Sequence, residues 1–146
     1  MTTARFSFRL ISSIMLMLLA LTACSSRTPI TLYDELGGQG KLEEISNRFI
    51  QQIGQNDALI GYFKNTNIDR FHQKFVEHLC KVSNGPCQYS GDSMHHVHTG
   101  MHISQAHFNT TVELLIIAMN EAHVAHTTQN KVLARLAPLR GAIIEK

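Results

Sequence analysis

The ten residues Met94–Ile103 read MHHVHTGMHI and hold four of the nine histidines of the chain. They stand directly before the longest amphipathic stretch, which begins near Ser104. Neutral imidazole is the commonest protein ligand of transition metals. Because Gly100 is a poor residue for a helix interior, the decamer predicts a short helix that ends near Thr99-Gly100. A single histidine on such a helix suits a cofactor better than a closed tetrahedral zinc site, which needs four ligands.

Apolar residues spaced three and four apart predict helices in the rest of the chain. The expected helices cover residues of about 41–55, 68–82, 104–125 and 129–144. Pro138 should kink or break the last of them, and residues 59–63 should form one or two short helical turns. The segment 34–40 is rich in glycine, so no regular structure is expected there. No alternating strand pattern and no repeat occurs, and the predicted fold class is therefore all-α.

Short motifs follow one another along the chain in a characteristic order. They are Leu32-Tyr33-Asp34-Glu35-Leu36-Gly37-Gly38, Arg48-Phe49-Ile50, Tyr62-Phe63-Lys64-Asn65-Thr66-Asn67, Gly85-Pro86, Tyr89-Ser90-Gly91, Met94, Val97-His98-Thr99-Gly100, Ile103 and His107-Phe108. In order and spacing the series resembles the group I truncated haemoglobins, over nearly all of the chain after residue 30. The resemblance implies a truncated globin fold, a two-over-two helical sandwich around haem b.

The same resemblance implies roles for residues around the haem iron. The histidine of the family's Val-His-x-Gly motif is the proximal iron ligand, and here it is His98. Phe63 takes the place of the aromatic residue that packs on the haem face. Thr66 and Tyr89 match positions near the cofactor edge, although either can instead serve only a turn. Phe108 is a further expected cofactor contact.

The expected gas-binding side of the pocket is apolar. Ile50, Phe71 and Phe75 fall where the family often has Tyr or Gln facing the bound gas. A hydrogen bond to bound dioxygen can be worth about 1–3 kcal/mol, and this wall cannot donate one. We therefore expect faster dioxygen release than in a Tyr/Gln-type relative. His78, on the same helical face, is the distal candidate; the alternative is a partly buried histidine bonded to a neighbour.

The first part of the chain has the layout of an export signal. Residues 1–23 contain two arginines, an apolar run and then small residues before Cys24. The sequence Leu-Thr-Ala-Cys resembles the lipobox of bacterial lipoproteins, in which the cysteine is lipidated. Residues 24–31 would then be a tether and 32–146 the globin domain, anchored in the cell envelope at the outer membrane facing the periplasm. The alternative is a retained membrane anchor, although the apolar run is shorter than the ~20 residues of a spanning helix.

Export would also change the charge balance and the chemistry of the cysteines. The signal carries two of the 13 basic residues, so 11 would remain against 11 acidic ones, and no basic surface for nucleic acid is expected. An oxidising compartment favours a disulfide between Cys80 and Cys87. The alternatives are two free thiols, or a metal-binding pair with His78.

Three functions are compatible with these patterns. The first is a lipid-anchored haem protein that binds dioxygen, nitric oxide and carbon monoxide. Members of the family are associated with oxygen binding and with oxidation of nitric oxide to nitrate, a catalysis that needs an external reductase, so enzyme status stays open. The second is a histidine-rich, metal-binding envelope lipoprotein without haem. The third is a globin-fold scaffold that has lost haem.

Overall fold

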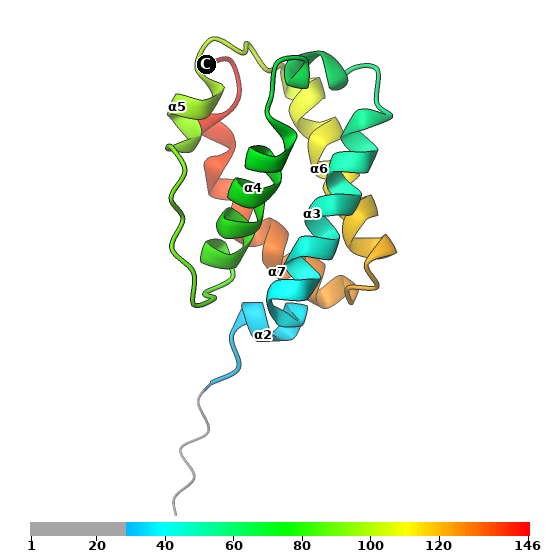
Figure 1. The fold of residues 1–146 in the computed structure, drawn as a ribbon, viewed down its shortest axis with the longest axis vertical. Helices are drawn as coiled ribbons and strands as arrows, with labels where there is room; N and C mark the ends of the chain where they lie inside the picture. Colours follow the sequence, from blue (N-terminus) through cyan, green and yellow to red (C-terminus); the bar gives the residue numbers. More distant parts are fainter. Residues whose placement is uncertain (1–28) are drawn as a thin grey trace, which may run out of the picture.

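The computed structural model describes residues 29–146, and all the regular secondary structure in this part of the chain is helical (Figure 1). Its elements are the α-helices α2 (Leu32–Leu36), α3 (Gly38–Gly54), α4 (Ile68–Val82), α5 (Met94–His98), α6 (Gln105–Glu121) and α7 (His126–Leu136), and the 3-10 helices η2 (Ile60–Phe63) and η3 (Ala137–Ala142). The expected export signal and Cys24 lie outside the described residues. Within residues 29–146, no helix combines the length and the apolar character that a membrane span requires.

The helices form two layers. α3 packs antiparallel to α4 in one layer, α6 and α7 pack together in the other, and α3 also contacts α6 while α4 contacts α7 (Figure 1). The side chains buried between the layers are mainly Leu42, Ile45, Phe49, Ile53, Val76, Leu79, Leu115, Ala118 and Met119. These residues include the whole predicted inward face of α3. The two-over-two sandwich expected from the sequence is therefore confirmed.

The glycine-rich segment after Asp34 is helical, which corrects the prediction of irregular structure. The Thr31 hydroxyl accepts a hydrogen bond from the backbone N–H of Asp34 (3.1 Å), and the Asp34 carboxylate accepts one from that of Thr31 (3.0 Å). This capping box satisfies two otherwise unpaired donors at the start of α2. Gly37, at φ 101°, ends α2 in the left-handed region and turns the chain into α3. Burial of Leu36 and Leu42 then offsets the poor helix propensity of the glycines.

The boundaries of the last two long helices also differ from the prediction. α6 is capped by Ser104 as expected but ends at Glu121, because the turn that follows places His123 at φ 57°, outside the helical region. α7 accordingly begins at His126, three residues earlier than predicted. It stops before Pro138, which lies in the first turn of η3, where its missing N–H costs no hydrogen bond.

Candidate functional site

His98 is held in a defined orientation at the end of α5. The helix begins after Ser93, whose hydroxyl accepts a hydrogen bond from the backbone N–H of His96 (3.2 Å). The Nδ1 atom of His98 lies 2.6 Å from the carbonyl oxygen of Met94. Because a carbonyl oxygen only accepts, Nδ1 must carry a proton, and in the neutral ring the lone pair is then on Nε2. His98 is half-buried and so presents Nε2 in the tautomer that binds metal.

The segment that follows α5 pairs with the last described residues. The backbone N–H groups of Gly100 and His102 both donate to the carbonyl oxygen of Lys146 (2.9 and 3.2 Å), and that of Glu145 donates to Ile103 (3.0 Å). α5 also packs against η3. The C-terminal side of the His98 helix is therefore fixed by contacts far away in sequence.

The remaining histidines of the decamer do not form a metal cage. His95, His96 and His102 are all exposed. Within residues 29–146, no group of three or more His, Cys, Asp or Glu side chains is placed to hold a metal ion. The histidine-rich metal-binding alternative therefore has no preformed site in the described part of the chain.

Four phenylalanines form a continuous row, here called the aromatic row. Phe63 meets Phe71 edge to face with ring centroids 5.1 Å apart, and Phe71 stacks on Phe75 at 5.9 Å. Phe75 in turn stacks on Phe49 at 4.8 Å. Phe49 is buried, whereas the other three rings are half-buried, and so is Ile50, the next residue on α3. The structure thus brings together three predicted pocket residues, Phe63, Phe71 and Phe75, and adds Phe49, which the sequence pattern assigned only to the core.

The His78 side chain points toward the segment between α4 and α5. Its ring lies edge to face with Tyr89, with the centroids 5.3 Å apart. Its Nδ1 atom is buried and finds no hydrogen-bond partner among the described residues. Burial, and secondarily the charge of Lys81, lower the pKa of His78 below its usual value. The side chain is therefore a neutral imidazole at neutral pH.

The other residues predicted to contact the cofactor are Thr66, Phe108 and Tyr89, and each has different neighbours. Thr66 is exposed in the turn after η2, where its backbone N–H donates to the carbonyl of Phe63 (3.0 Å). Phe108 is half-buried on α6, with the Arg140 guanidinium 5.8 Å from its ring centroid. Tyr89 donates its hydroxyl to the carbonyl oxygen of Asp92 (2.9 Å), and burial raises the pKa of that hydroxyl.

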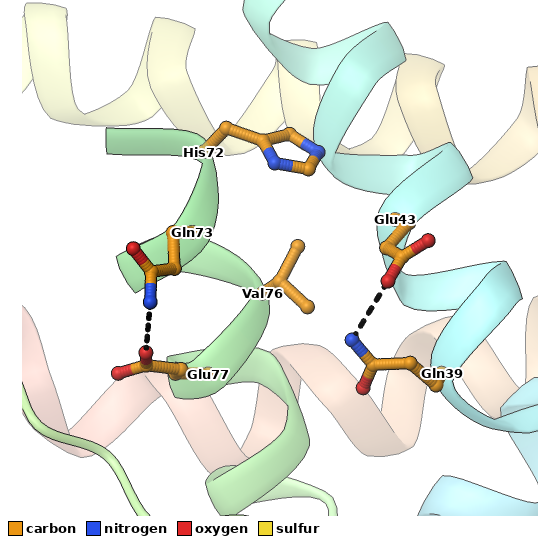
Figure 2. A pocket seen from close by; sticks show the side chains of 6 residues that line it. All are labelled: Gln39, Glu43, His72, Gln73, Val76 and Glu77. Carbon is orange, nitrogen blue, oxygen red and sulfur yellow. Dashed lines mark hydrogen bonds between the residues drawn. The ribbon is translucent and has the colours of Figure 1, made fainter. Parts of the chain in front are cut away.

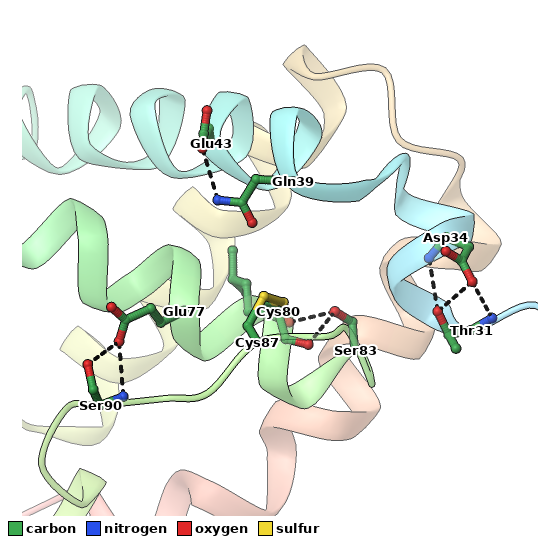
Figure 3. The surroundings of a disulfide bond; sticks show 10 residues. Thr31, Asp34, Gln39, Glu43, Glu77, Cys80, Ser83, Cys87 and Ser90 are labelled. Carbon is green, nitrogen blue, oxygen red and sulfur yellow. Dashed lines mark hydrogen bonds between the residues drawn. A yellow bond between two sulfur atoms is a disulfide. The ribbon is translucent and has the colours of Figure 1, made fainter.

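A disulfide joins Cys80 at the end of α4 to Cys87 in the following segment, with Cα atoms 6.0 Å apart (Figure 3). Of the three states considered from the sequence, this is the one the structure contains. Gly85 lies in the enclosed turn. A Cβ atom on Gly85 would stand 2.5 Å from the Cys80 sulfur and equally close to the Tyr33 ring, so only glycine fits.

A cavity of 290 Å³ opens between α3 and α4 (Figure 2). It is lined by Gln39, Glu43, His72, Gln73, Val76 and Glu77. The His72 ring points into it, and its buried Nε2 has no partner among the described residues. A flat apolar cofactor needs mostly apolar and aromatic walls. The aromatic row meets that requirement and this cavity does not.

The comparisons with known proteins agree with this fold. The model of the bacterial-like globin family matches residues 31–145. The group 1 truncated haemoglobin GlbN of Mycolicibacterium paratuberculosis is 33% identical over 111 residues, covering 76% of this chain and 82% of the relative. GlbN of Nostoc sp. is 30% identical and covers 80% and 98%.

Solved structures show the same fold. The truncated haemoglobin of Tetrahymena pyriformis in its Fe(III) form has a TM-score of 0.77 at 25% identity, covering 80% of this chain and 99% of that one. The group II truncated haemoglobin of Bacillus anthracis has a TM-score of 0.73 at 18% identity, covering 82% and 95%, a likeness of fold alone. The chain therefore belongs to the bacterial-like globin family, as a truncated globin of group 1.

Proposed function

We propose that this protein binds haem through Nε2 of His98, with the aromatic row and Ile50 as the opposite wall, and binds diatomic gases at the iron. The observation that carries the proposal is the 2.6 Å contact between His98 Nδ1 and the Met94 carbonyl, which leaves Nε2 free for a metal. The curated relatives are named truncated haemoglobins. Aromatic and aliphatic walls beside one imidazole are the groups that a haem pocket needs.

Haem at this site would supply an iron on which dioxygen, nitric oxide or carbon monoxide can bind. The residues of the chain then set the surroundings of that gas. The apolar side chains of Ile50, Phe71 and Phe75 would keep water out but donate no hydrogen bond. They would therefore stabilise bound dioxygen, which becomes polarised, less than they stabilise less polar bound gases. The function that we propose is oxygen binding or transport, and oxidation of nitric oxide would additionally require an external reductant.

The decisive experiment is the absorption spectrum of residues 29–146 produced with hemin available, oxidised and then reduced under carbon monoxide. The expected result is a Soret band that shifts on reduction and again with the gas. His98→Ala should abolish normal ligation, whereas the matched control His96→Ala, two residues away and exposed, should keep it. A colourless protein, or equal loss in both variants, would show that the proposal is wrong.

We further propose that the chain is a lipoprotein attached to the cell envelope through Cys24. The support is the sequence of residues 1–24, together with the Cys80–Cys87 disulfide, which is a bond of oxidising compartments. In cells that express the full chain, labelled fatty acid should enter the wild type and be absent from Cys24→Ser. Equal labelling of both, or a soluble wild type without label, would contradict the anchor.

A further inference from the structure

The segment between α4 and α5, residues 83–93, doubles back along α4 and is tied to it at three places. Cys80 is joined to Cys87, the His78 ring lies against Tyr89, and the Glu77 carboxylate holds Ser90. The segment therefore runs antiparallel to α4, because residues that come later in the segment contact residues that come earlier in α4. We call residues 83–93 the α4–α5 connection.

Of the three ties, the one between Glu77 and Ser90 comes last in the sequence before α5, and Figure 3 shows it together with the disulfide. One carboxylate oxygen accepts hydrogen bonds from the backbone N–H of Ser90 (3.0 Å) and from its hydroxyl (2.9 Å). The Lys74 ammonium donates to both carboxylate oxygens (2.9 and 3.0 Å) and also bonds the Ser90 hydroxyl. Gln73 donates a further bond to the other oxygen (3.1 Å). The carboxylate is thus fully engaged on two sides.

The charged state of Glu77 is strongly favoured by this arrangement. The backbone N–H of Ser90, then Lys74 and the Ser90 hydroxyl lower the pKa of Glu77 to about 2. The side chains of Lys74 and Glu77, which form an ion pair, are each only 18% exposed. Solvent therefore screens their attraction less than it would at an open surface. Such charge-assisted hydrogen bonds hold their partners in a narrow geometry.

The position of this tie along the chain distinguishes it from the disulfide. Ser90 lies three residues before Ser93, the residue that caps α5. Cys87 is three residues further back, so the disulfide leaves the chain from residue 88 onward to be placed by other contacts. Among the described residues, the hydrogen bonds of Glu77 and Lys74 with Ser90 are therefore the last ones that join the connection to α4 before the helix that carries His98.

We propose that Glu77 is a positioning residue for the proximal helix: by holding Ser90 on α4, it sets the place of α5 and of His98 relative to Phe71 and Phe75, the two members of the aromatic row that lie on α4. The inference rests on the proposed function, in which His98 binds haem iron. Lys74 completes the contact by orienting the carboxylate. Residues that orient a metal ligand from outside typically change metal affinity by about 10- to 100-fold.

The first test needs no haem. Hydrogen exchange is measured on the haem-free chain for peptides that cover residues 88–98, in the wild type and in Glu77→Gln. The matched control is Glu43→Gln, the same loss of charge on α3, where the carboxylate accepts a bond from Gln39. Exchange in 88–98 should rise in Glu77→Gln only, while the peptides of α6 stay as protected as in the wild type.

The second test uses the haem-loaded chain. Hemin transfer to an excess of a haem-free scavenger globin should be on the order of tenfold faster in Glu77→Gln than in Glu43→Gln. The iron–imidazole stretching band of the reduced protein should also shift, which a loss of global stability alone would not produce. The inference would be overturned if Glu77→Gln showed the same hydrogen exchange and the same rate of hemin transfer as the wild type.

Two further variants keep the outcomes distinct. Should Glu77→Gln fail to fold, Ser90→Ala, which loses the hydroxyl but keeps the backbone N–H, is judged by the same measurements and should show smaller changes of the same sign; wild-type values there would overturn the inference. His98→Ala tests the proposed function separately. If His98→Ala retains hemin like the wild type, the haem assignment fails, whatever the exchange data show for Glu77.

Discussion

The hydroxyl of Tyr62 and Nδ1 of His107 lie 2.7 Å apart and join η2 to the first turn of α6. The two rings also meet edge to face, with centroids 5.5 Å apart. The residues are 45 positions apart in the chain, and both are half-buried. This hydrogen bond therefore fixes the end of the aromatic row, since Phe63 directly follows Tyr62.

Tyr62→Phe should lower the free energy of unfolding by about 1 kcal/mol, because it removes one hydrogen bond and leaves the imidazole of His107 without its partner. The measurement is urea unfolding followed by circular dichroism. Tyr33→Phe is the matched control, since the Tyr33 hydroxyl has no hydrogen-bond partner among the described residues. If both variants lost the same unfolding free energy, the effect would come from removing a tyrosine hydroxyl and not from the hydrogen bond with His107.

The acid dependence of stability should change in Glu77→Gln. The carboxyl has a pKa of about 2 in the folded chain, against the ordinary value of 4.5. Its contribution is therefore fully present above about pH 4.5 and is lost as the pH falls through about 2. Between these values the unfolding free energy of the wild type should fall more steeply than that of Glu77→Gln, and the two should converge at the acid end.

The control for this pH series is the double variant Cys80→Ser/Cys87→Ser, which is also destabilised but removes no acidic group. Its curve should run parallel to that of the wild type through the acid range. The carboxyls of Asp34 and Glu44, whose pKa values are also lowered by hydrogen bonds, account for the slope that remains in Glu77→Gln. Parallel curves for the wild type and Glu77→Gln would contradict the prediction.

Loss of the disulfide should cost about 2.5 kcal/mol of stability, the chain-entropy value for so short a loop. The double variant and the reduced wild type should have the same urea midpoint, below that of the oxidised wild type, with unchanged helical content. Hydrogen exchange should increase mainly around residues 84–88 and less in α5, because the contact of Glu77 with Ser90 remains. A reduced wild type as stable as the oxidised one would contradict this.

A polar group on the gas-binding wall should slow the release of dioxygen, provided that haem binds as proposed. Phe71→Gln introduces a donor on the inward face of α4, and a hydrogen bond of about 1–3 kcal/mol corresponds to a rate lower by about 5- to 150-fold. Stopped-flow release should show this effect for dioxygen and a far smaller one for carbon monoxide. Phe71→Leu is the apolar control, and an equal slowing in that variant would point to packing instead.

The sequence predicted those features that depend on neighbouring residues. The apolar face of α3, the cap of α6 at Ser104 and the interruption at Pro138 all follow local rules of spacing, capping and proline chemistry. The helical segment after Thr31 was missed, although Thr31-x-x-Asp34 is a recognisable capping-box pattern. The glycines lower the helix propensity of this segment, but the cap and the buried leucines outweigh them.

The contacts that position the candidate site were not predictable in the same way. The hydrogen bond between Tyr62 and His107, and the one between Glu77 and Ser90, form only because distant segments return to one place. Ser90 and Glu77 are ordinary polar residues in a single sequence, and surface charges usually contact only water. His98 could be predicted as the iron ligand because its motif is local, whereas the contacts of Glu77 and Ser90 depend on the path of the connection along α4.

The antiparallel course of the α4–α5 connection means that its contacts can open in only one order. The connection would separate from α4 first beside α5, then at Ser90 and Tyr89. It would stop at the Cys80–Cys87 bond, which does not break thermally. The proximal helix could thus leave its place and return in the same register while the four long helices stay folded. Such a limited opening would let a cofactor enter after the chain has already folded.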